Sequence, residues 1–479
     1  MSFTLRLFWE AAGGNVPEHW EFKTIDELLE HPKAISVGVM YPGSDTDGGV
    51  PLIKVSDVKN GAIASRPSFC ISNKVDEEYK RTRLNGSELL LTLVGNPGDC
   101  VIVTDEMCGW NVARALAVIR LKDTQLRSWI RYVLASKPAQ HLIEARLNTT
   151  VQKTLNLKDV REIGIPIPPK EERDSITKVI DLIEKNTLLN TQINQTLESI
   201  AQVIFKSWFV DFDPVRAKIA AKQEGKDPEL AAMCAISGKN EEELQQMSED
   251  DFAELQASAA LFPDELVESE LGDVPKGWDK YSLSKMITLI GGGTPKRSEP
   301  NYWNGDIFWF SVKDVPNEGE VFVITTQEKI SELGLNKSST KLLPVGTTII
   351  TARGTVGKIA LVGYEMAMNQ SCYGVQGKNG VKQFMTYYLI KNAVEVLKKN
   401  THGAVFDTIT QSTFDTVTSI KPSIEMMDLF ESKVEKIMGH IKNNLYENNS
   451  LIALRDTLLP KLLSGEMDML GLQGEGIDG

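Results

Sequence analysis

Two long stretches of the chain have apolar residues that recur at alternate steps of four and three, the spacing of a coiled-coil seam. The first seam comprises Ile176, Ile180, Ile183, Thr187, Asn190, Asn194, Leu197, Ala201, Ile204 and Trp208. The second comprises Phe430, Val434, Ile437, Ile441, Asn444, Asn448, Leu451, Arg455, Leu458 and Leu462. Both seams are mainly apolar near their ends and have two asparagines at their centre. The pattern predicts two long helices that pack against each other.

An antiparallel pairing of these helices puts residue 192 opposite residue 446. It brings Asn190 near Asn448 and Asn194 near Asn444, so that the amides can satisfy one another. A polar layer inside a seam lowers stability but penalises slipped registers. We interpret the four asparagines as determinants of register; the alternative is that they face solvent.

Before each long helix, the hydrophobic pattern changes to short β-rich runs broken by glycine and proline, followed by a helical stretch. Examples of the runs are residues 113–119 and 347–351; the helical stretches lie near 129–145 and 384–399. A proline-containing step then leads into each long helix. The mixture predicts a compact α/β or α+β unit in both places.

The chain also repeats itself with a period of about 258 residues, too long for a solenoid and suited to two copies of a domain pair. Four matches occur in the same order: Gly14–Trp20 with Gly272–Trp278, Val55–Val58 with Val312–Val315, Thr92–Gly98 with Thr351–Gly357, and Met107–Asn111 with Met366–Asn369. We therefore expect a first head at 1–169, a helical region at 170–212, a connector at 213–270, a second head at 271–422 and a second helical region at 423–479.

The length and composition of the chain indicate that it folds into more than one domain. The chain has 479 residues, of which 42% are hydrophobic and 24% charged, more than one core usually accommodates. No apolar run approaches the roughly 18 residues that cross a bilayer, and the N-terminus lacks a signal-peptide pattern, so we expect a cytoplasmic protein without membrane association. Five cysteines without C-x-x-C spacing are typical of reduced thiols rather than of disulfides or a zinc ribbon.

The net charge of −13 is unevenly distributed. Basic and acidic residues balance over 1–169, the connector carries −10, and the second head carries +4. The total charge therefore does not exclude DNA as a partner. We interpret the acidic run of the connector as a solvated helical face; the alternatives are a DNA mimic or a docking surface.

Signatures of catalysis are missing from the sequence. The glycine-rich stretches at 290–296 and 354–358 lack the spacing of a phosphate-binding loop, and the five histidines form no metal-binding pattern. No nucleophile elbow is present, and neither Asn96-Pro97 nor Asp213-Pro214 continues into the clamp of an amino-group methyltransferase. We therefore expect a protein without a catalytic, cofactor or metal site.

Three strings resemble the specificity subunit of type I restriction-modification systems. They are the stretch from Asn194 to Val215, which contains Ser207-Trp-Phe-Val-Asp-Phe-Asp-Pro214, the string Gly272–Trp278, and the string Leu454–Glu466. The likeness covers nearly the whole chain and includes the duplication. It implies two target recognition domains on an antiparallel coiled coil, each reading half of a split DNA sequence in the major groove.

The resemblance also implies the partners of this chain. Two modification subunits would dock on the helical regions and methylate adenine N6, and restriction subunits that hydrolyse ATP and cut DNA would join them. S-adenosylmethionine, ATP and Mg²⁺ would belong to these partners. The chain itself would be non-catalytic.

Geometry adds two expectations about the DNA. A seam of about 33 residues is roughly 50 Å long, enough to hold two heads more than one DNA turn apart, so the bound sequence should be bipartite with a fixed gap. Because the heads differ in sequence, the half-sites should differ too.

Candidate DNA-binding residues follow from chemistry alone. Arg and Lys suit guanine, Asn and Gln suit adenine, and Lys, Ser and Thr suit phosphates. In the first head and near its hinge the candidates are Lys54, Ser56, Asn96, Arg114, Thr150 and Gln152. In the second head they are Thr294, Lys296, Arg297, Lys313, Arg353, Thr355 and Lys358. Each could equally be a solvated surface residue. We assign Trp20 and Trp278, at duplicated positions, to packing.

Two other functions stay open on the residues alone. The chain could be an enzyme with an unrecognised motif, such as a fused methyltransferase or nuclease, which purified protein with S-adenosylmethionine and DNA would reveal. It could also be a scaffold whose connector binds a protein, which predicts DNA binding without sequence preference. With one neutral head and one of +4, we expect the isolated chain to bind DNA weakly.

Overall fold

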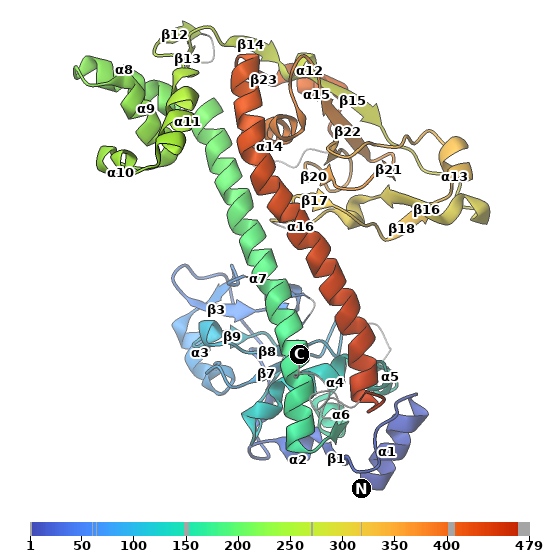
Figure 1. The fold of residues 1–479 in the computed structure, drawn as a ribbon. Coiled ribbons are helices and arrows are strands. Elements are labelled where there is room, and N and C mark those ends of the chain that lie inside the picture. The colour runs from blue at the N-terminus through green and yellow to red at the C-terminus, as the bar shows by residue number, and fades with distance from the viewer. Residues whose placement is uncertain are drawn as a thin grey trace, which may run out of the picture. The chain divides into compact units, whose positions relative to one another are not determined.

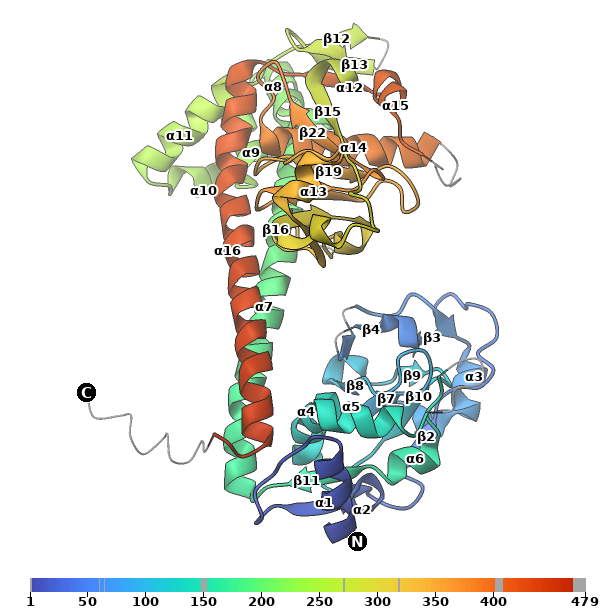
Figure 2. The same cartoon turned by 90° about the vertical axis from the view of Figure 1, so that its right-hand side faces the viewer.

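The computed structural model describes residues 2–59, 61–63, 65–147, 153–269, 272–317, 319–400 and 408–467. Its contacts divide the chain into two units, the first formed by Met1–Asn186 and Ser450–Gly479 and the second by Thr187–Asn449. Each unit contains one predicted head and part of two long helices, α7 (Lys170–Phe209) and α16 (Ile424–Leu463). Figures 1 and 2 show the path of the chain.

The first head contains two main sheets and several short helices. Its strands are β1 (Glu21–Thr24), β2 (Ile35–Val37), β3 (Val50–Ile53), β4 (Val58–Lys59), β5 (Ala62–Ile63), β6 (Cys70–Ile71), β7 (Leu89–Thr92), β8 (Cys100–Ile102), β9 (Asn111–Val112), β10 (Leu116–Ile119) and β11 (Gly164–Ile167). Its helices are α1 (Ser2–Ala11), α2 (Ile25–Leu28), α3 (Asn73–Glu78), α4 (Arg127–Ala135), α5 (Lys137–Glu144) and α6 (Leu157–Arg161), with 3-10 turns at Val55–Asp57, Lys80–Thr82, Asp105–Met107 and Thr124–Leu126.

The second head repeats this plan. Its strands are β14 (Asp279–Ser282), β15 (Ile287–Gly291), β16 (Trp303–Phe310), β17 (Phe322–Val323), β18 (Glu328–Ile330), β19 (Thr348–Thr351), β20 (Ile359–Val362), β21 (Met366–Met368), β22 (Cys372–Gly377) and β23 (Thr418–Lys421). Its helices are α12 (Leu283–Met286), α13 (Glu332–Asn336), α14 (Gln383–Asn400) and α15 (Gln411–Thr416), with 3-10 turns at Pro300–Tyr302 and Val312–Asp314.

Sheet topology confirms the duplication. The order β2-β10-β7-β8 in the first head corresponds to β15-β22-β19-β20, to which the second head adds β17 at the edge. Likewise β6-β3-β9 corresponds to β18-β16-β21, and the two-stranded sheet β1-β11 to β14-β23. In both heads the middle strand of the smaller sheet pairs parallel with one neighbour and antiparallel with the other. The two heads are copies of one α+β fold.

One sequence match needs correction. The first head pairs Leu52 with Asn111 and Ile53 with Val112, and the second pairs Trp309 with Ala367 and Phe310 with Met368. Asn111 therefore corresponds to Ala367, and Asn369 corresponds to Ala113. The alignment of Met107–Asn111 with Met366–Asn369 was two residues out of register at its end, because the segments differ in length before they enter the strand.

Each head continues its core into the two long helices. In the first unit Ile176, Ile180 and Ile183 of α7 and Leu462 of α16 share one buried cluster with Trp129 of α4. In the second unit Phe205 and Trp208 of α7 share a cluster with Phe430 of α16 and with Trp278 and Tyr388 of the head. The sequence seams are thus buried faces, and burial of this apolar surface ties each head to its part of the helix pair.

The centre of the seam contains the expected amide pairs. In the second unit the Nδ2 of Asn190 donates to Oδ1 of Asn448 at 3.0 Å, and the Nδ2 of Asn444 donates to Oδ1 of Asn194 at 2.9 Å. Asn194 is fully buried, and Asn190 and Asn448 are 9% and 6% exposed. The helices therefore pair antiparallel in the predicted register, with Asn190, Asn194 and Asn448 buried and Asn444 partly buried.

The two duplicated tryptophans have the predicted packing role. Trp20 is buried against Trp129 and donates its indole N–H to Glu172 at the start of α7. Trp278 is buried against Phe209, the last residue of α7, and against Phe212, which follows α7 in the chain. Both tryptophans thus join a head to a long helix.

The connector is a small folded module as well as a link. It consists of α8 (Asp213–Gln223), α9 (Pro228–Ser237), α10 (Glu241–Gln245) and α11 (Glu249–Ala260), followed by the hairpin β12 (Leu266–Ser269) and β13 (Gly272–Pro275). Ala232, Met233, Leu244, Leu255 and Ala259 form its own buried cluster. The acidic residues 241–243 and 249–251 are exposed, as a solvated helical face requires.

Candidate nucleic-acid interface

Two candidate residues of the first head, Lys54 and Arg114, line an open cleft of about 460 Å³; Ser56 and Asn96 are not among its lining residues. Three chain segments, 39–42, 52–55 and 113–115, build it, and hydrogen bonds between their backbones hold them together. The N–H of Arg114 donates to the carbonyl of Val39 at 2.9 Å, and the N–H of Ala113 donates to that of Ile53 at 2.8 Å. The residues that line the cleft are Val39, Met40, Pro42, Leu52, Lys54, Val55, Ala113, Arg114 and Ala115.

The repeated Val-x-Asp-Val string forms the 3-10 turn beside this cleft. In the first head the carboxylate of Asp57 accepts the N–H of Lys54 at 2.7 Å, and in the second that of Asp314 accepts the N–H of Ser311 at 2.8 Å. The duplicated aspartate thus caps the turn. It presents Ser56 in one head and Lys313 in the other, both exposed.

The repeated Thr-x-x-Gly-x-x-Gly string forms a second turn. Thr92 donates its hydroxyl to the carbonyl of Asn96 and accepts the N–H of Asp99 at 2.9 Å. Thr351 makes the same two bonds, to the carbonyl of Thr355 and from the N–H of Lys358. The glycines that follow, among them Gly98 and Gly357, have positive φ, which a side chain would strain. Both duplicated strings are therefore scaffold.

The residues between these scaffold positions differ in charge between the two heads. The turn of the second head carries Arg353 and Lys358 where that of the first has Val94 and Asp99. Arg353 and Lys358 are exposed and form no ion pair with any residue that the structure describes. They are free to meet a phosphate, whereas the first head has no cation at either position.

Lys54 and Arg114, the cations of the first cleft, form no ion pair with a residue that the structure describes. Among the described residues that line it none is acidic. Lys54 lies with Nζ 3.5 Å from the centre of the Phe69 ring, and Arg114 is exposed beside it. Asn96 is exposed but donates its amide to Asp99 at 2.8 Å. This cleft combines positive charge with an apolar wall.

Three candidates of the second head already have partners. Arg297 forms an ion pair with Glu328 and stacks over Trp303 at 3.8 Å; the bond to Glu328 raises the pKa of Arg297 and lowers the pKa of Glu328. Lys296 pairs with Glu299 at 3.2 Å. The hydroxyl of Thr294 donates to Oε1 of Gln370.

Gln370 is a candidate that the sequence analysis missed. It is exposed and follows Asn369, whose N–H donates to the carbonyl of Phe310 at 2.9 Å as Ala113 does to Ile53. A correct alignment of this segment would have shown it opposite Arg114. Thr150 and Gln152, predicted near the hinge of the first head, lie outside the described residues.

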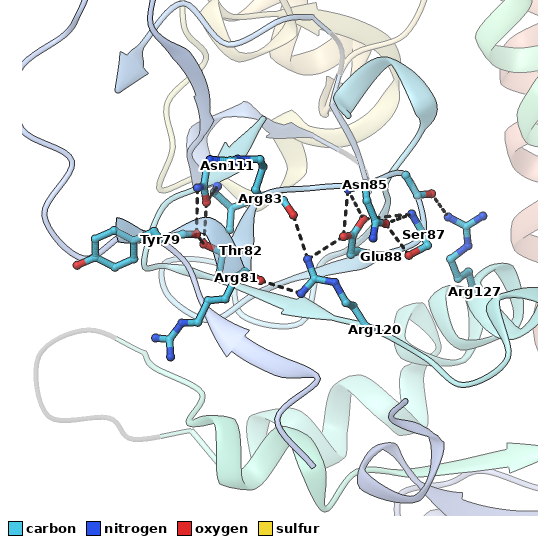
Figure 3. A network of polar contacts seen from close by, with 12 residues as sticks. Tyr79, Arg81, Thr82, Arg83, Asn85, Ser87, Glu88, Asn111, Arg120 and Arg127 are labelled. Carbon is cyan, nitrogen blue, oxygen red and sulfur yellow. Dashed lines mark hydrogen bonds and ion pairs between the residues drawn. The ribbon is translucent and has the colours of Figure 1, made fainter. Parts of the chain in front are cut away.

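A polar network around Glu88 and Arg120 in the first head is structural (Figure 3). The carboxylate of Glu88, fully buried, accepts bonds from Arg120 at 2.9 Å and from the N–H groups of Asn85 and Ser87. In the second head the equivalent pair is Thr347 and Gln376, joined by a neutral bond of 3.2 Å. An ion pair in one copy thus has a neutral counterpart in the other, so the charge is not essential to the fold.

No helix in the described part of the chain is long and apolar enough to span a membrane. Nor do the described residues contain a cluster of three or more His, Cys, Asp or Glu side chains suited to a metal ion.

Comparisons with known proteins agree on one family. The model of the type I restriction modification DNA specificity domain matches residues 17–199 and 275–445. The HindI specificity subunit of Haemophilus influenzae is 36% identical over 340 residues, which cover 68% of this chain and 73% of that protein. The EcoBI specificity subunit of Escherichia coli is 27% identical over 230 residues, covering 47% and 46%. A crystal structure of an S subunit from M. genitalium, 14% identical, matches 93% of this chain and 96% of its own with a TM-score of 0.49.

Proposed function

The chain belongs to the family of type I restriction-modification specificity subunits, which are non-catalytic, and we propose that its two heads each read one half of a split, asymmetric site in double-stranded DNA. The observation that carries this proposal is that the two heads share one fold but expose different side chains. One fold occurs twice, with the same turns and the same strand order. The exposed side chains on those turns differ, so the two heads present different chemistry to the bases.

The length of the helices supports a site with a fixed gap. Both α7 and α16 have 40 residues, and a helix of that length is about 60 Å long. One turn of DNA is about 34–36 Å. Helices of this length suffice to hold two recognition domains more than one turn apart.

A second apolar stripe on α7 supports docking of the modification subunits on the helical regions. Leu189, Ile193, Ile200 and Val203 are 49%, 39%, 45% and 65% exposed, although they lie in a continuous helix. Their spacing of four, seven and three residues follows a coiled-coil repeat on a face other than the buried seam. Such a stripe suits apolar helices of a partner, and two modification subunits would fill this role.

The remaining partners and cofactors follow from the same proposal. Restriction subunits would join the complex of specificity and modification subunits, and S-adenosylmethionine, ATP and Mg²⁺ would bind to the partner subunits rather than to this chain. The complex would act on DNA in the cytoplasm.

Methylome sequencing tests the proposal. Cells that carry this chain with its modification subunit should acquire a split, asymmetric motif with methyladenine in each half. Cells with the modification subunit alone should lack it. If the complex assembles and no motif appears, the recognition function is wrong and a purely structural role takes its place.

A further inference from the structure

We propose, on the basis of the DNA-reading function above, that Arg114 and Gln370 occupy the same base-reading position in the two heads. Arg114 would contact a guanine in one half-site, and Gln370 would contact an adenine in the other.

Hydrogen bonds on either side establish that the two positions are equivalent. The carbonyl of Ala115 accepts the N–H of Leu93 at 2.8 Å, and that of Ser371 accepts the N–H of Ala352 at 2.7 Å. On the other side, Ala113 and Asn369 donate to the last residues of β3 and β16. One residue lies between these two anchors in each head, and it is Arg114 or Gln370.

The surroundings of Arg114 favour an electron-rich acceptor. Its side chain is exposed, it forms no ion pair with a described residue, and it lines the cleft together with Lys54. The rest of the cleft wall is apolar, from Val39, Met40 and Val55 among others. Guanine offers O6 and N7 to one guanidinium in the major groove, and an apolar wall beside a base edge excludes water.

The surroundings of Gln370 define which end of its amide faces outward. The Oε1 accepts the hydroxyl of Thr294, the residue that corresponds to Met40 in the first cleft, and this bond restrains the rotation of the amide. Nε2 remains free to donate to N7 of adenine, and the second lone pair of Oε1 can accept the N6 amino group. Thr294 is thus a positioning residue for Gln370.

An exposed arginine can also bind a phosphate instead of a base. The two kinds of contact predict different effects when the arginine is removed. A base contact carries sequence information at one position, whereas a phosphate contact weakens binding to all sequences alike. Lys358 of the second head should make a phosphate contact of this kind, because it is a single point charge on a turn.

The test is methylation of a randomised DNA library by the assembled complex of this chain and its modification subunits. The wild-type motif should contain a G·C pair in one half-site and, besides the methylated adenine, an A·T pair in the other. Arg114→Ala should relax that G·C position, with discrimination falling on the order of 10- to 100-fold. Gln370→Ala should relax the A·T position of the other half-site by a similar factor.

Two further variants serve as controls. Thr294→Val keeps the amide of Gln370 but removes its restraint, so it should partly relax the same position as Gln370→Ala. Lys358→Ala should lower methylation of all sites equally and leave the motif unchanged. Since all but Thr294 are exposed, matched thermal unfolding should show that the variants stay folded.

Several results would overturn the inference. They are a wild-type motif without the expected base pairs, an unchanged motif in both alanine variants, or a uniform loss of methylation like that of Lys358→Ala. A wild-type complex that assembles and methylates no motif would instead remove the proposed function itself.

Discussion

At the residue scale, the buried carboxylate of Glu88 shows how one head is fixed internally (Figure 3). Its partner Arg120 is 19% exposed and also donates to the carbonyls of Arg81 and Arg83. Arg120→Ala would leave a buried charge unpaired, so the free energy of unfolding of the first unit should fall by about 3–5 kcal/mol. Urea denaturation measures this free energy of unfolding. The exposed Arg81 is the matched control. Arg81→Ala should change the free energy of unfolding by less than about 0.5 kcal/mol. Equal effects of the two variants would contradict the role of the pair.

At the element scale, α7 and α16 combine an apolar seam with two amide pairs. Replacing both Asn194 and Asn444 by leucine should raise the unfolding temperature, because a buried polar layer is exchanged for apolar contact, and should also permit slipped or intermolecular pairings. Light scattering after size exclusion should then detect mixed oligomers. Asn444→Leu alone should lower stability by about 1–3 kcal/mol, since it leaves the buried amide of Asn194 without that partner. A double variant that stays monodisperse would show that the asparagines do not determine register.

At the scale of the whole molecule, the charge of the chain limits its own affinity for DNA. The first head is neutral and the second carries +4, and Arg297 and Lys296 already have acidic partners. The isolated chain should therefore bind its site more weakly than the assembled complex and with a shallower dependence on salt, because fewer phosphates are neutralised. Fluorescence anisotropy at several salt concentrations measures both quantities. Identical affinity and slope for the chain and the complex would refute this.

The sequence by itself determined the features that depend on local periodicity. The seam residues and the antiparallel register with Asn190 opposite Asn448 could be predicted because burial of a helix face repeats at fixed steps. The two copies of the head could be predicted because short strings recur in the same order. The duplicated strings could be recognised as well, although their role as turn scaffolds required the structure.

Only the tertiary structure decided which side chains share a surface. The equivalence of Arg114 and Gln370 depends on strand register, which pairs Leu116 with Thr92 and Cys372 with Thr351 across long stretches of chain. The partner of Arg297 lies 31 residues away, at Glu328. A sheet brings together residues that are distant in the chain, and a single sequence contains no periodic signal for such pairings.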